Sequence, residues 1–268
     1  MHHLGKTNLL IVLLLTFSIV AGAQAPQQKA DNTYIEAATL WQQAAGEARA
    51  LEYQTYLLAR LLLDRDLRNH RIRGRRAIIV DVDETILDNS RYQGMLINRG
   101  VNYPEGWTDW CNRAEATPIP GALEFVRYAH SRGVRVFYVT NRKIAEKDGT
   151  ARNLKSVGFP EVNDETLLVR TDNQSDSKEP RRQLIASHYH VVLLMGDNLN
   201  DFSDVFEKSK TVAARLDATE KNRSQFGTRF IVLPNPMYGD WENAIYDYNF
   251  SLSSDQKQQK RRALLKDY

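Results

Sequence analysis

The feature that most restricts the fold is an alternation of short, apolar, β-branched runs with helical stretches, which begins at residue 77. Each run has the length of a strand, and the segments between the runs are long enough for helices. Strands separated in this way form parallel sheets that are covered by helices on both faces. We therefore expect an α/β fold with a doubly wound, parallel five-stranded sheet. The five predicted strands lie in "AIIVDVD", "VRVFYVTN", "TLLVR", "HVVLLMGD" and "RFIVLPN".

Two further segments are predicted to be helical. No proline interrupts residues 34–67, and apolar residues recur there at helical spacing, which predicts one long helix or two helices joined near Gly46. Residues 87–120 follow the first strand and are too long for a simple crossover loop; they contain the helical stretch "GWTDWCNRAEA". We expect both segments to form a helical cap or subdomain, with the insertion over the C-terminal edge of the sheet.

The chain is expected to divide into four parts. Residues 1–25 form a signal peptide, and 26–76 form an N-terminal helical region. The core occupies 77–250, with its helical insertion at about 87–120. Residues 251–268 form a basic tail that contains "KQQKRRALLK", for which we predict a solvated helix end in preference to a binding patch.

The N-terminus has the layout of a secretory signal. Lys6 precedes an apolar run at 9–20, which is followed by the small residues of "AGAQA". The run is short for a membrane span, so an uncleaved anchor is the less favoured alternative. Cleavage is expected near Ala23 or Ala25, and Pro26 makes the second position less attractive. The protein is therefore expected to be exported, either to the periplasm or as a secreted protein.

Cysteine content and charge exclude several other classes. The single cysteine, Cys111, rules out an intramolecular disulfide, and the lack of a cysteine near residue 22 argues against a lipid anchor. We expect a buried, inert thiol, with an intermolecular bridge as the alternative. The net charge of +3 comes from 36 basic and 33 acidic residues spread along the chain, so no nucleic acid polymer is expected as a partner.

Polar residues gather where the predicted strands end. In open parallel sheets, ligands bind outside the carboxyl ends of the strands. Residues two apart in an extended chain point to the same side, so two acids after one strand can converge, and others can reach them from a neighbouring strand. The residues at these ends are Asp81 and Asp83 after the first strand, Thr140 and Asn141 after the second, and Asp197 and Asp201 after the fourth.

Four carboxylates in one small volume indicate a cation. Without one, the acids would repel each other and raise one another's pKa values. Hard oxygen ligands of this kind suit Mg²⁺, which combines one or two carboxylates with water and a substrate phosphate. The structural alternative is that "DVD" and "GDNLND" are only strand ends, turns and helix caps. The presence of both motifs, in register with the strands, favours the metal site.

Five motifs together resemble a known family. "DVDET", "VTNRK", the lysine of "SDSKEP" and "GDNLNDF" are similar to the four motifs of the haloacid dehalogenase (HAD) superfamily. More narrowly, "IIVDVDETILDNS", "PGALEFVRYA", "VTNRK", "GDNLNDF" and "FIVLPNPMYGDWE" resemble the class C, or DDDD-type, bacterial acid phosphatases. The similarity runs from about residue 34 to 248 and implies a HAD-like Rossmannoid fold. Several family members are lipoproteins, but this chain lacks the required cysteine.

The resemblance assigns roles to the four aspartates. It implies that Asp81 attacks phosphorus and forms an aspartyl phosphate, and that Asp83 protonates the leaving alkoxide and later activates water. The metal, Mg²⁺, would be held by the carboxylates of Asp81 and Asp197 and the main-chain carbonyl of Asp83. Asp201 would be a further ligand, directly or through water.

Phosphate binding requires donors and a cation, because phosphoryl transfer leaves charge on three oxygens. Thr140 and the amide of Asn141 fit the donor role. Lys178 is the preferred cation, although Arg181 and Arg182 stand nearby at the same predicted helix start. The alternative is that Lys178 is an ordinary surface lysine with no role in the site.

Aromatic residues are the candidates for substrate recognition. The resemblance implies that one aromatic from the insertion and one from "LPNPMYGDW" stack on a ring such as a nucleobase or nicotinamide. The candidates are Tyr103, Trp107, Trp110 and Tyr238. Trp107 and Tyr238 are favoured, with Tyr103 assisting, and a core role is the alternative for each.

The expected function is that of a Mg²⁺-dependent acid phosphatase of broad specificity for small phosphomonoesters, such as nucleoside monophosphates. A receiver domain also uses aspartates, a threonine and a lysine, but it is far shorter and needs no second acid motif. A non-catalytic storage protein on the same fold could lose the nucleophile, whereas Asp81 is present. The family suggests a homodimer, but the sequence leaves the oligomeric state open.

Overall fold

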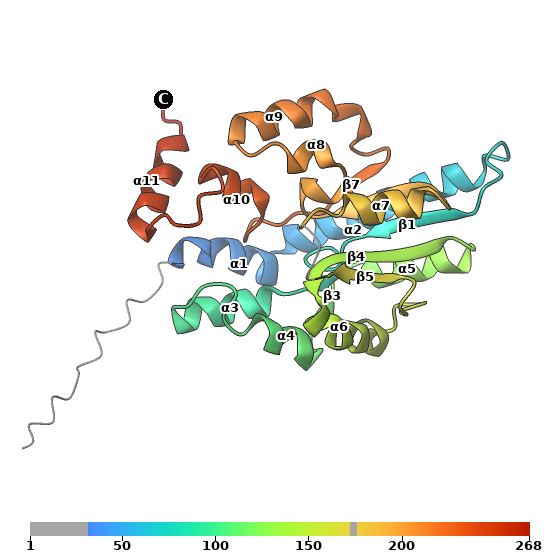
Figure 1. Cartoon of the computed structure of the whole chain (residues 1–268), viewed down its shortest axis with the longest axis horizontal. Coiled ribbons are helices and arrows are strands. Elements are labelled where there is room, and N and C mark those ends of the chain that lie inside the picture. Colours follow the sequence, from blue (N-terminus) through green and yellow to red (C-terminus); the bar gives the residue numbers. More distant parts are fainter. Residues whose placement is uncertain (1–31, 172–175) are drawn as a thin grey trace, which may run out of the picture.

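The computed structural model describes residues 32–171 and 176–268 (Figure 1). The signal peptide expected at 1–25 lies outside the described residues. The expected five-stranded parallel sheet is confirmed, with the strand order β5-β4-β1-β6-β7. Its strands are β1 (Arg76–Val80), β4 (Arg135–Lys143), β5 (Leu167–Arg170), β6 (His190–Gly196) and β7 (Phe230–Val232).

The central strand β1 separates two hydrophobic cores. Ile78 and Val80 belong to the core on one face of the sheet, and Ala77 and Ile79 belong to the core on the other. This alternation follows from the period of two in a strand, and burial on both faces explains why the strand is continuously apolar. Helices α2, α5 and α6 contribute to the first core and α7, α8 and α9 to the second, as expected for a doubly wound fold.

The flanking helices have the following bounds. Those between the strands are α5 (Ala122–Ser131), α6 (Ile144–Val157), α7 (Glu179–Ala186), η2 (Leu199–Asp201), α8 (Asp204–Glu207), α9 (Val212–Lys221) and η3 (Arg223–Gln225). Those at the two ends of the described chain are η1 (Thr33–Ile35), α1 (Glu36–Ala44), α2 (Gly46–Leu67), α10 (Asp240–Ile245) and α11 (Ser254–Leu264). Across the described ranges, none of the helices combines the length and the apolar character that a membrane span requires.

The N-terminal helical region consists of two helices joined at Ala45, next to the predicted break at Gly46. Ala45 is extended, with φ −80° and ψ 130°, which ends α1 and starts α2. Helix α2 packs its buried face, which includes Tyr56, Ala59 and Leu63, into the same core as α5. These contacts explain why so apolar a helix is stable beside the sheet.

The insertion after β1 contains β2 (Leu87–Asp88), α3 (Ser90–Arg99), α4 (Trp107–Arg113) and β3 (Thr117–Pro118). It is anchored to α6 at two points. The side chain of Asn153 binds both main-chain groups of Ala116, at 3.0 Å to N and 2.8 Å to O. Gly149 lets α4 approach closely, because an added Cβ would lie 2.5 Å from the carbonyl oxygen of Cys111. Cys111 itself is buried, as expected.

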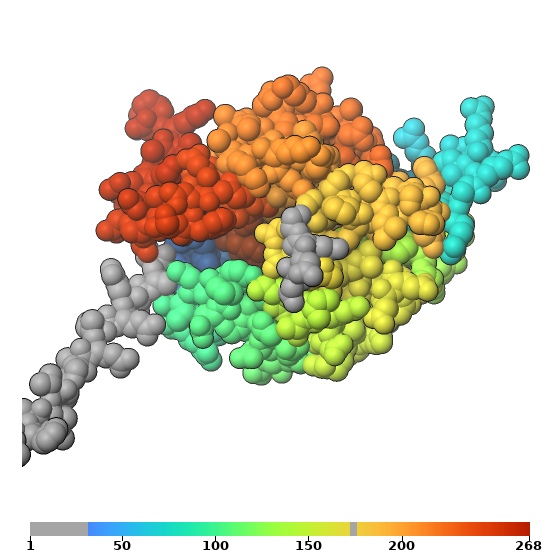
Figure 2. All heavy atoms as spheres, in the orientation of Figure 1, coloured from blue at the N-terminus to red at the C-terminus, as the bar shows by residue number. Residues whose placement is uncertain are grey.

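Helix α10 packs against α9, and the C-terminal segment that contains α10 and α11 lies beside this part of the molecule on the face shown in Figure 2. Helix α11 is tied to the body of the protein through Arg261. Its Nη1 donates to the hydroxyl of Tyr246 at 2.8 Å, and its guanidinium carbon lies 3.8 Å from the ring centre of Tyr34. The helical part of the predicted basic tail is Ser254–Leu264, and its Arg261 packs on the rest of the molecule, so this helix is not wholly solvated.

Candidate active site

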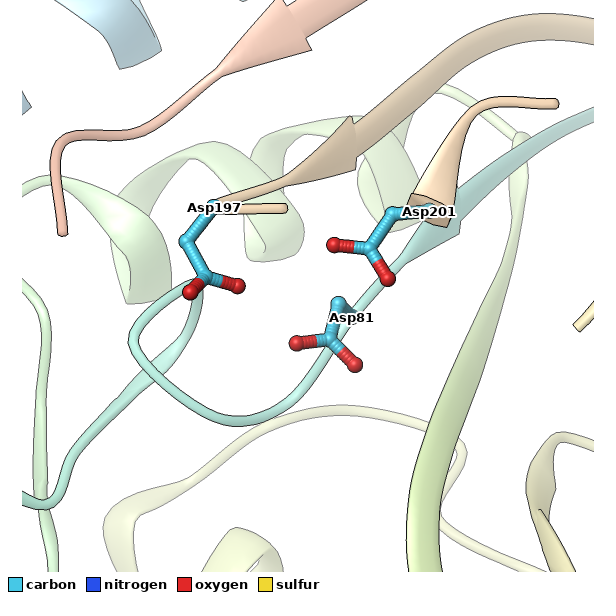
Figure 3. A group of neighbouring side chains, drawn as sticks. All are labelled: Asp81, Asp197 and Asp201. Atoms are coloured by element: carbon cyan, nitrogen blue, oxygen red, sulfur yellow. The ribbon is translucent and has the colours of Figure 1, made fainter. Parts of the chain in front are cut away.

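Three aspartates meet at the carboxyl edge of the sheet (Figure 3). Asp81 follows β1, Asp197 follows β6, and Asp201 ends η2. One carboxylate oxygen from each lies within 4.8 Å of the others, and the side chains point toward a common space. The convergence predicted from the strand ends is therefore present for these three residues.

The turn after β6 brings Asp201 back toward Asp81. The side chain of Asn198 caps η2 by accepting from the main-chain N–H of Asn200 at 3.1 Å, and Oδ2 of Asp201 accepts from the main-chain N–H of Asn198 at 3.1 Å. Asn198 and Asn200 also donate to Oδ2 of Asp240, at 3.0 and 2.5 Å. The "GDNLND" sequence is thus both a cap and the support of two acids.

Lys178 is the cation in contact with this cluster. Its Nζ donates to Oδ1 of Asp201 at 2.6 Å and to Oδ1 of Asp81, and the side chains of all three residues are buried. Burial alone would lower the pKa of Lys178, but the carboxylates of Asp201 and Asp81 outweigh it and raise that pKa above its usual value. Lys178 is therefore held as a cation beside the acids.

The electrostatics of the cluster favour an added metal ion. Burial raises the pKa of Asp81 to about 7, against the opposing effect of Lys178, and the nearby charges of Asp201 and Asp83 raise it further. Burial also raises the pKa of Asp197 well above its usual range, and Asp201 and Asp81 add to that effect. A divalent ion would reverse both shifts, and three hard oxygen donors within reach of one point suit such an ion. The residues present thus fit a metal site.

The carboxylate of Asp83 lies on another side of the same space. Its Oδ1 accepts from Nε and Nη2 of Arg142, at 3.0 and 2.8 Å, and from Nδ2 of Asn89 at 2.9 Å. Its Oδ2 lies 3.3 Å from Oγ1 of Thr140. The chain reaches this arrangement by turning at Glu84, which has a positive φ of 51°. Asp83 therefore faces the strand β4, whereas Asp81 faces the other two acids.

The three candidate cations have separate partners. Arg181 donates to the main-chain oxygen of Thr140 and to Oδ1 of Asn141, both at 2.6 Å. It thus supports the last part of β4, which includes both residues, whereas the sequence pattern predicts them to lie after that strand. Arg182 bonds to Glu179 at 2.6 Å and to the main-chain oxygen of Asn200 at 2.8 Å. The structure brings Lys178, and neither arginine side chain, into contact with the clustered aspartates.

The four aspartates Asp81, Asp83, Asp197 and Asp201, together with Lys178, border a cavity of about 820 Å³. Of the aromatic candidates, Tyr103 and Tyr238 line it. Trp107 does not belong to its lining among the described residues; its ring packs 4.9 Å from that of Tyr92 and 5.4 Å from the guanidinium carbon of Arg142. Tyr248 and Phe250, which sequence reasoning missed, also line the cavity.

Arg142 and Asn89 are the other residues that sequence reasoning missed. Both lie inside motifs that had been singled out, "VTNRK" and "DETILDNS". The signal was available for Arg142, because it stands two positions after Thr140 in an extended strand and so shares its side of β4.

Comparison with known proteins agrees with this geometry. Residues 13–241 match the model of the acid phosphatase family of the HAD superfamily, subfamily IIIB. The class C acid phosphatase from Bacillus anthracis is 42% identical, with a TM-score of 0.84; the match covers 88% of this chain and 98% of that one. The crystal structure of the Bacillus anthracis class C acid phosphatase with tungstate bound matches with the same identity and coverage and a TM-score of 0.85.

More distant relatives are plant proteins. Acid phosphatase 1 of Solanum lycopersicum is 24% identical over 174 residues, covering 62% of this chain and 59% of that protein. The stem 31 kDa glycoprotein of Glycine max is 24% identical over 165 residues, covering 60% and 58%. The chain thus spans about three fifths of the length of these two relatives. The match to the family model and the likeness to the bacterial enzyme over most of both chains show that this protein belongs to the acid phosphatases of HAD subfamily IIIB, a family of phosphomonoesterases.

Proposed function

We propose that this protein is a Mg²⁺-dependent acid phosphatase that hydrolyses small phosphomonoesters through an aspartyl-phosphate intermediate. The observation that carries the proposal is the cluster of Asp81, Asp197 and Asp201 around Lys178, beside Asp83, at the carboxyl edge of the sheet. The tungstate in the related Bacillus anthracis structure supports it, since tungstate is a tetrahedral oxyanion like phosphate.

The nucleophile is Asp81. One of its carboxylate oxygens attacks phosphorus, and the bond from phosphorus to the ester oxygen breaks as the new bond forms. Lys178, which already contacts Asp81, supplies a fixed positive charge for the phosphoryl oxygens. Oγ1 of Thr140 and the main-chain N–H of Asn141 are the neutral donors, held in place by Arg181.

The acid and base is Asp83. It gives a proton to the leaving oxygen in the first half of the reaction and removes one from the attacking water in the second. A Mg²⁺ ion held by the carboxylates of Asp81 and Asp197, the main-chain carbonyl of Asp83 and Asp201 would neutralise the clustered acids and the charge on the phosphoryl group.

The preferred substrates are phosphomonoesters that carry a ring, such as nucleoside monophosphates. Tyr103 and Tyr238 line the cavity that contains Asp81 and Asp83, so a base could stack there while its phosphate reaches the acids. Trp107 would contribute through its contact with Tyr103, whose ring centre lies 6.1 Å away. The proposed substrate is thus a small molecule and not a nucleic acid polymer. A homodimer is the assembly that the family resemblance suggests.

Export is part of the proposal. The apolar run at 9–20 and the small residues after it support a signal peptide that is cleaved near Ala23 or Ala25, and thereby support export to the periplasm or out of the cell. N-terminal sequencing of protein purified from its native host tests this, and retention of Met1 in the exported protein would contradict it.

A panel of phosphomonoesters tests the proposed activity. Phosphate release should be measured from nucleoside monophosphates, an aryl phosphate and an alkyl phosphate, each with and without Mg²⁺ and at several pH values. We expect turnover that requires the metal and favours acidic pH. Absence of turnover with every ester in the presence of Mg²⁺ would contradict the proposal.

A further inference from the structure

We propose that Arg142 and Asn89 are positioning residues that bind one oxygen of Asp83, Oδ1, and thereby leave the other, Oδ2, as the atom that exchanges protons with the substrate. The inference rests on the proposed role of Asp83 as acid and base. It assigns a purpose to two buried polar residues that neither hold the metal nor touch the phosphate.

Arg142 is built into the protein as a fixed clamp. It is 2% exposed, and Nε and Nη2 both donate to Oδ1 of Asp83, at 3.0 and 2.8 Å. Its third nitrogen, Nη1, donates to Oγ1 of Thr150 on α6 at 3.0 Å. Because the guanidinium group is planar and rigid, these contacts from two elements fix its orientation. A carboxylate that binds to it has its own orientation fixed in turn.

Asn89 completes the clamp from the insertion. Its side chain is fully buried, and Nδ2 donates to Oδ1 of Asp83 at 2.9 Å. Its own Oδ1 accepts from Nε1 of Trp110 at 2.8 Å and from Nη2 of Arg142 at 3.2 Å. Reversing the amide would set its N–H groups against these two donors, so the orientation of Asn89 is determined by its neighbours.

The two oxygens of Asp83 are consequently unequal. Oδ1 accepts from three N–H groups, whereas Oδ2 has Oγ1 of Thr140 at 3.3 Å as its contact among the described residues. An oxygen that already accepts three hydrogen bonds has no lone pair left to bind a proton. A proton that Asp83 carries to the substrate must therefore sit on Oδ2.

The reaction step then follows with a defined path for the proton. As the Asp81 oxygen forms its bond to phosphorus, the bond between phosphorus and the ester oxygen breaks. The proton leaves Oδ2 of Asp83 and bonds to that ester oxygen, which departs as an alcohol. The negative charge left on Asp83 is stabilised by the guanidinium group of Arg142, which already lies 2.8 Å from Oδ1 before the reaction.

Arg142 acts through Asp83 because its own surface is covered. The residues that line the cavity in the described part of the chain include Asp83 but not Arg142 or Asn89. The ring of Trp107 lies 5.4 Å from the guanidinium carbon of Arg142. Arg142 therefore acts on the reaction through Asp83 and not by direct contact with a bound phosphate.

Arg142→Lys and Asn89→Ser test the clamp separately. Each variant is assayed with p-nitrophenyl phosphate, whose leaving group needs little protonation, and with an alkyl phosphate such as glycerol 3-phosphate, whose leaving group needs a proton. We expect kcat/KM for the alkyl phosphate, which reports the steps up to departure of the alcohol and not the later hydrolysis of the phosphoenzyme, to fall about 10-fold or more beyond any fall for the aryl phosphate. A merely structural role would lower both to a similar extent.

The matched control is Arg135→Lys. Arg135 lies at the start of the same strand, β4, and its Nη1 and Nη2 bind the carboxylates of Glu161 and Glu165 at 2.8 and 2.9 Å, at the edge of the sheet opposite the site. We expect this variant to keep the parent ratio of aryl to alkyl turnover. Folding of every variant is checked by circular dichroism and by its melting temperature. Arg142→Lys and Asn89→Ser are independent substitutions, so if one of them fails to fold, the other still tests the clamp.

Asp83→Asn separates failure of this inference from failure of the proposed function. If Asp83→Asn does not discriminate between the two leaving groups, the acid role of Asp83 is wrong, and the clamp falls with it. If Asp83→Asn discriminates but Arg142→Lys and Asn89→Ser do not, the acid role stands and the clamp is overturned. In the Asp83→Asn background, Arg142→Lys should add no further discrimination, because the residue that it positions is already absent.

Discussion

A Cβ atom added at Gly196 would lie 2.5 Å from the Cβ of Asp201. The last residue of β6 therefore has to be glycine for Asp201 to fold back toward Asp81 and Lys178. Gly196→Ala should displace Asp201 from the acid cluster. We expect at least a roughly 10-fold rise in the Mg²⁺ concentration that gives half-maximal activity, as for loss of support to a metal ligand. Titration of activity with Mg²⁺ measures this.

The control for Gly196→Ala is Gly46→Ala. Gly46 begins α2 and has no neighbouring atom within 4 Å of an added Cβ. This variant should keep the Mg²⁺ dependence of the parent. If Gly196→Ala also kept the Mg²⁺ dependence of the parent, the position of Asp201 would not matter for metal binding.

Removal of the metal should abolish activity and lower stability. Asp81 and Asp197 have raised pKa values, because burial and repulsion from nearby aspartates, above all Asp201, disfavour their charged forms. EDTA treatment should stop phosphate release, and added Mg²⁺ should restore it. The melting temperature at neutral pH should rise when Mg²⁺ is added, since an ion that binds the folded state stabilises it. Full activity in exhaustively metal-free protein would contradict the metal site.

Much of the fold was predictable because its signals are local. The five strands are short, apolar runs, and their burial on both faces gives each run its continuous hydrophobic character. The acids at the strand ends followed from the same pattern, since Asp81 and Asp197 come directly after β1 and β6. The break between α1 and α2 was also indicated by Gly46, although the extended residue is its neighbour Ala45.

The contacts made by the rest of the site depend on tertiary packing. The two-residue spacing from Thr140 places Arg142 on the same side of β4, but "VTNRK" does not indicate that Arg142 is buried against Asp83, because arginine in a polar stretch is more often exposed. Tyr248 reaches the cavity from a turn in which both Asp247 and Tyr248 have positive φ, at 52° and 56°, with no glycine to mark it. Such positions become visible only when the elements are packed together.

Glu52 gives a pH dependence of stability that is separate from the active site. It is 2% exposed between α1 and α2, and its Oε1 accepts from Nε2 of Gln42 at 2.7 Å. Burial raises its pKa from 4.5 to about 7, against the hydrogen bond from Gln42, which lowers it. The folded state thus holds this proton more tightly than the unfolded chain. The stability from Glu52 is fully present below pH 4.5 and is lost as the pH rises through about 7.

Glu52→Gln should remove that dependence. Relative to the parent, the free energy of unfolding of the variant should improve between about pH 5 and about pH 8 by on the order of 2 kcal/mol. Urea denaturation at both pH values measures it. Glu47→Gln, an exposed substitution on the same helix, should leave the parent dependence in place. A flat parent profile would show that Glu52 ionises as easily in the folded state as in the unfolded one.

Recognition of a substrate ring should depend on the aromatics that line the cavity. Tyr103→Ala and Tyr238→Ala should each weaken kcat/KM for a nucleoside monophosphate more than for a small alkyl phosphate, because only the nucleotide offers a ring to stack. The expected difference is about 1 to 3 kcal/mol for a base on an aromatic side chain. Tyr53→Ala, at an exposed tyrosine on α2, is the control. Equal losses on both substrates would assign Tyr103 and Tyr238 to structure alone.

The roles of Asp81 and Asp83 can be distinguished by whether the asparagine variant of each still forms a phosphoenzyme. Asp81→Asn replaces the nucleophilic carboxylate with a neutral amide and should abolish any phosphoenzyme. Asp83→Asn keeps the nucleophile but lacks the proton donor, so it should form phosphoenzyme from an aryl phosphate more readily than from an alkyl phosphate. It should then hydrolyse the intermediate slowly, since no base activates the water.

Rapid-quench trapping of the aspartyl phosphate measures both variants directly, after their folding and metal binding have been checked. The parent should accumulate little intermediate, and Asp83→Asn should accumulate it during the first turnover of the aryl phosphate. The two residues already differ in their contacts, since Asp81 bonds to Lys178 and Asp83 to Arg142. Phosphoenzyme formed by Asp81→Asn would show that Asp81 is not the nucleophile. Turnover of the alkyl phosphate at the parent rate by Asp83→Asn would show that Asp83 is not the acid, because this leaving group needs a proton to depart.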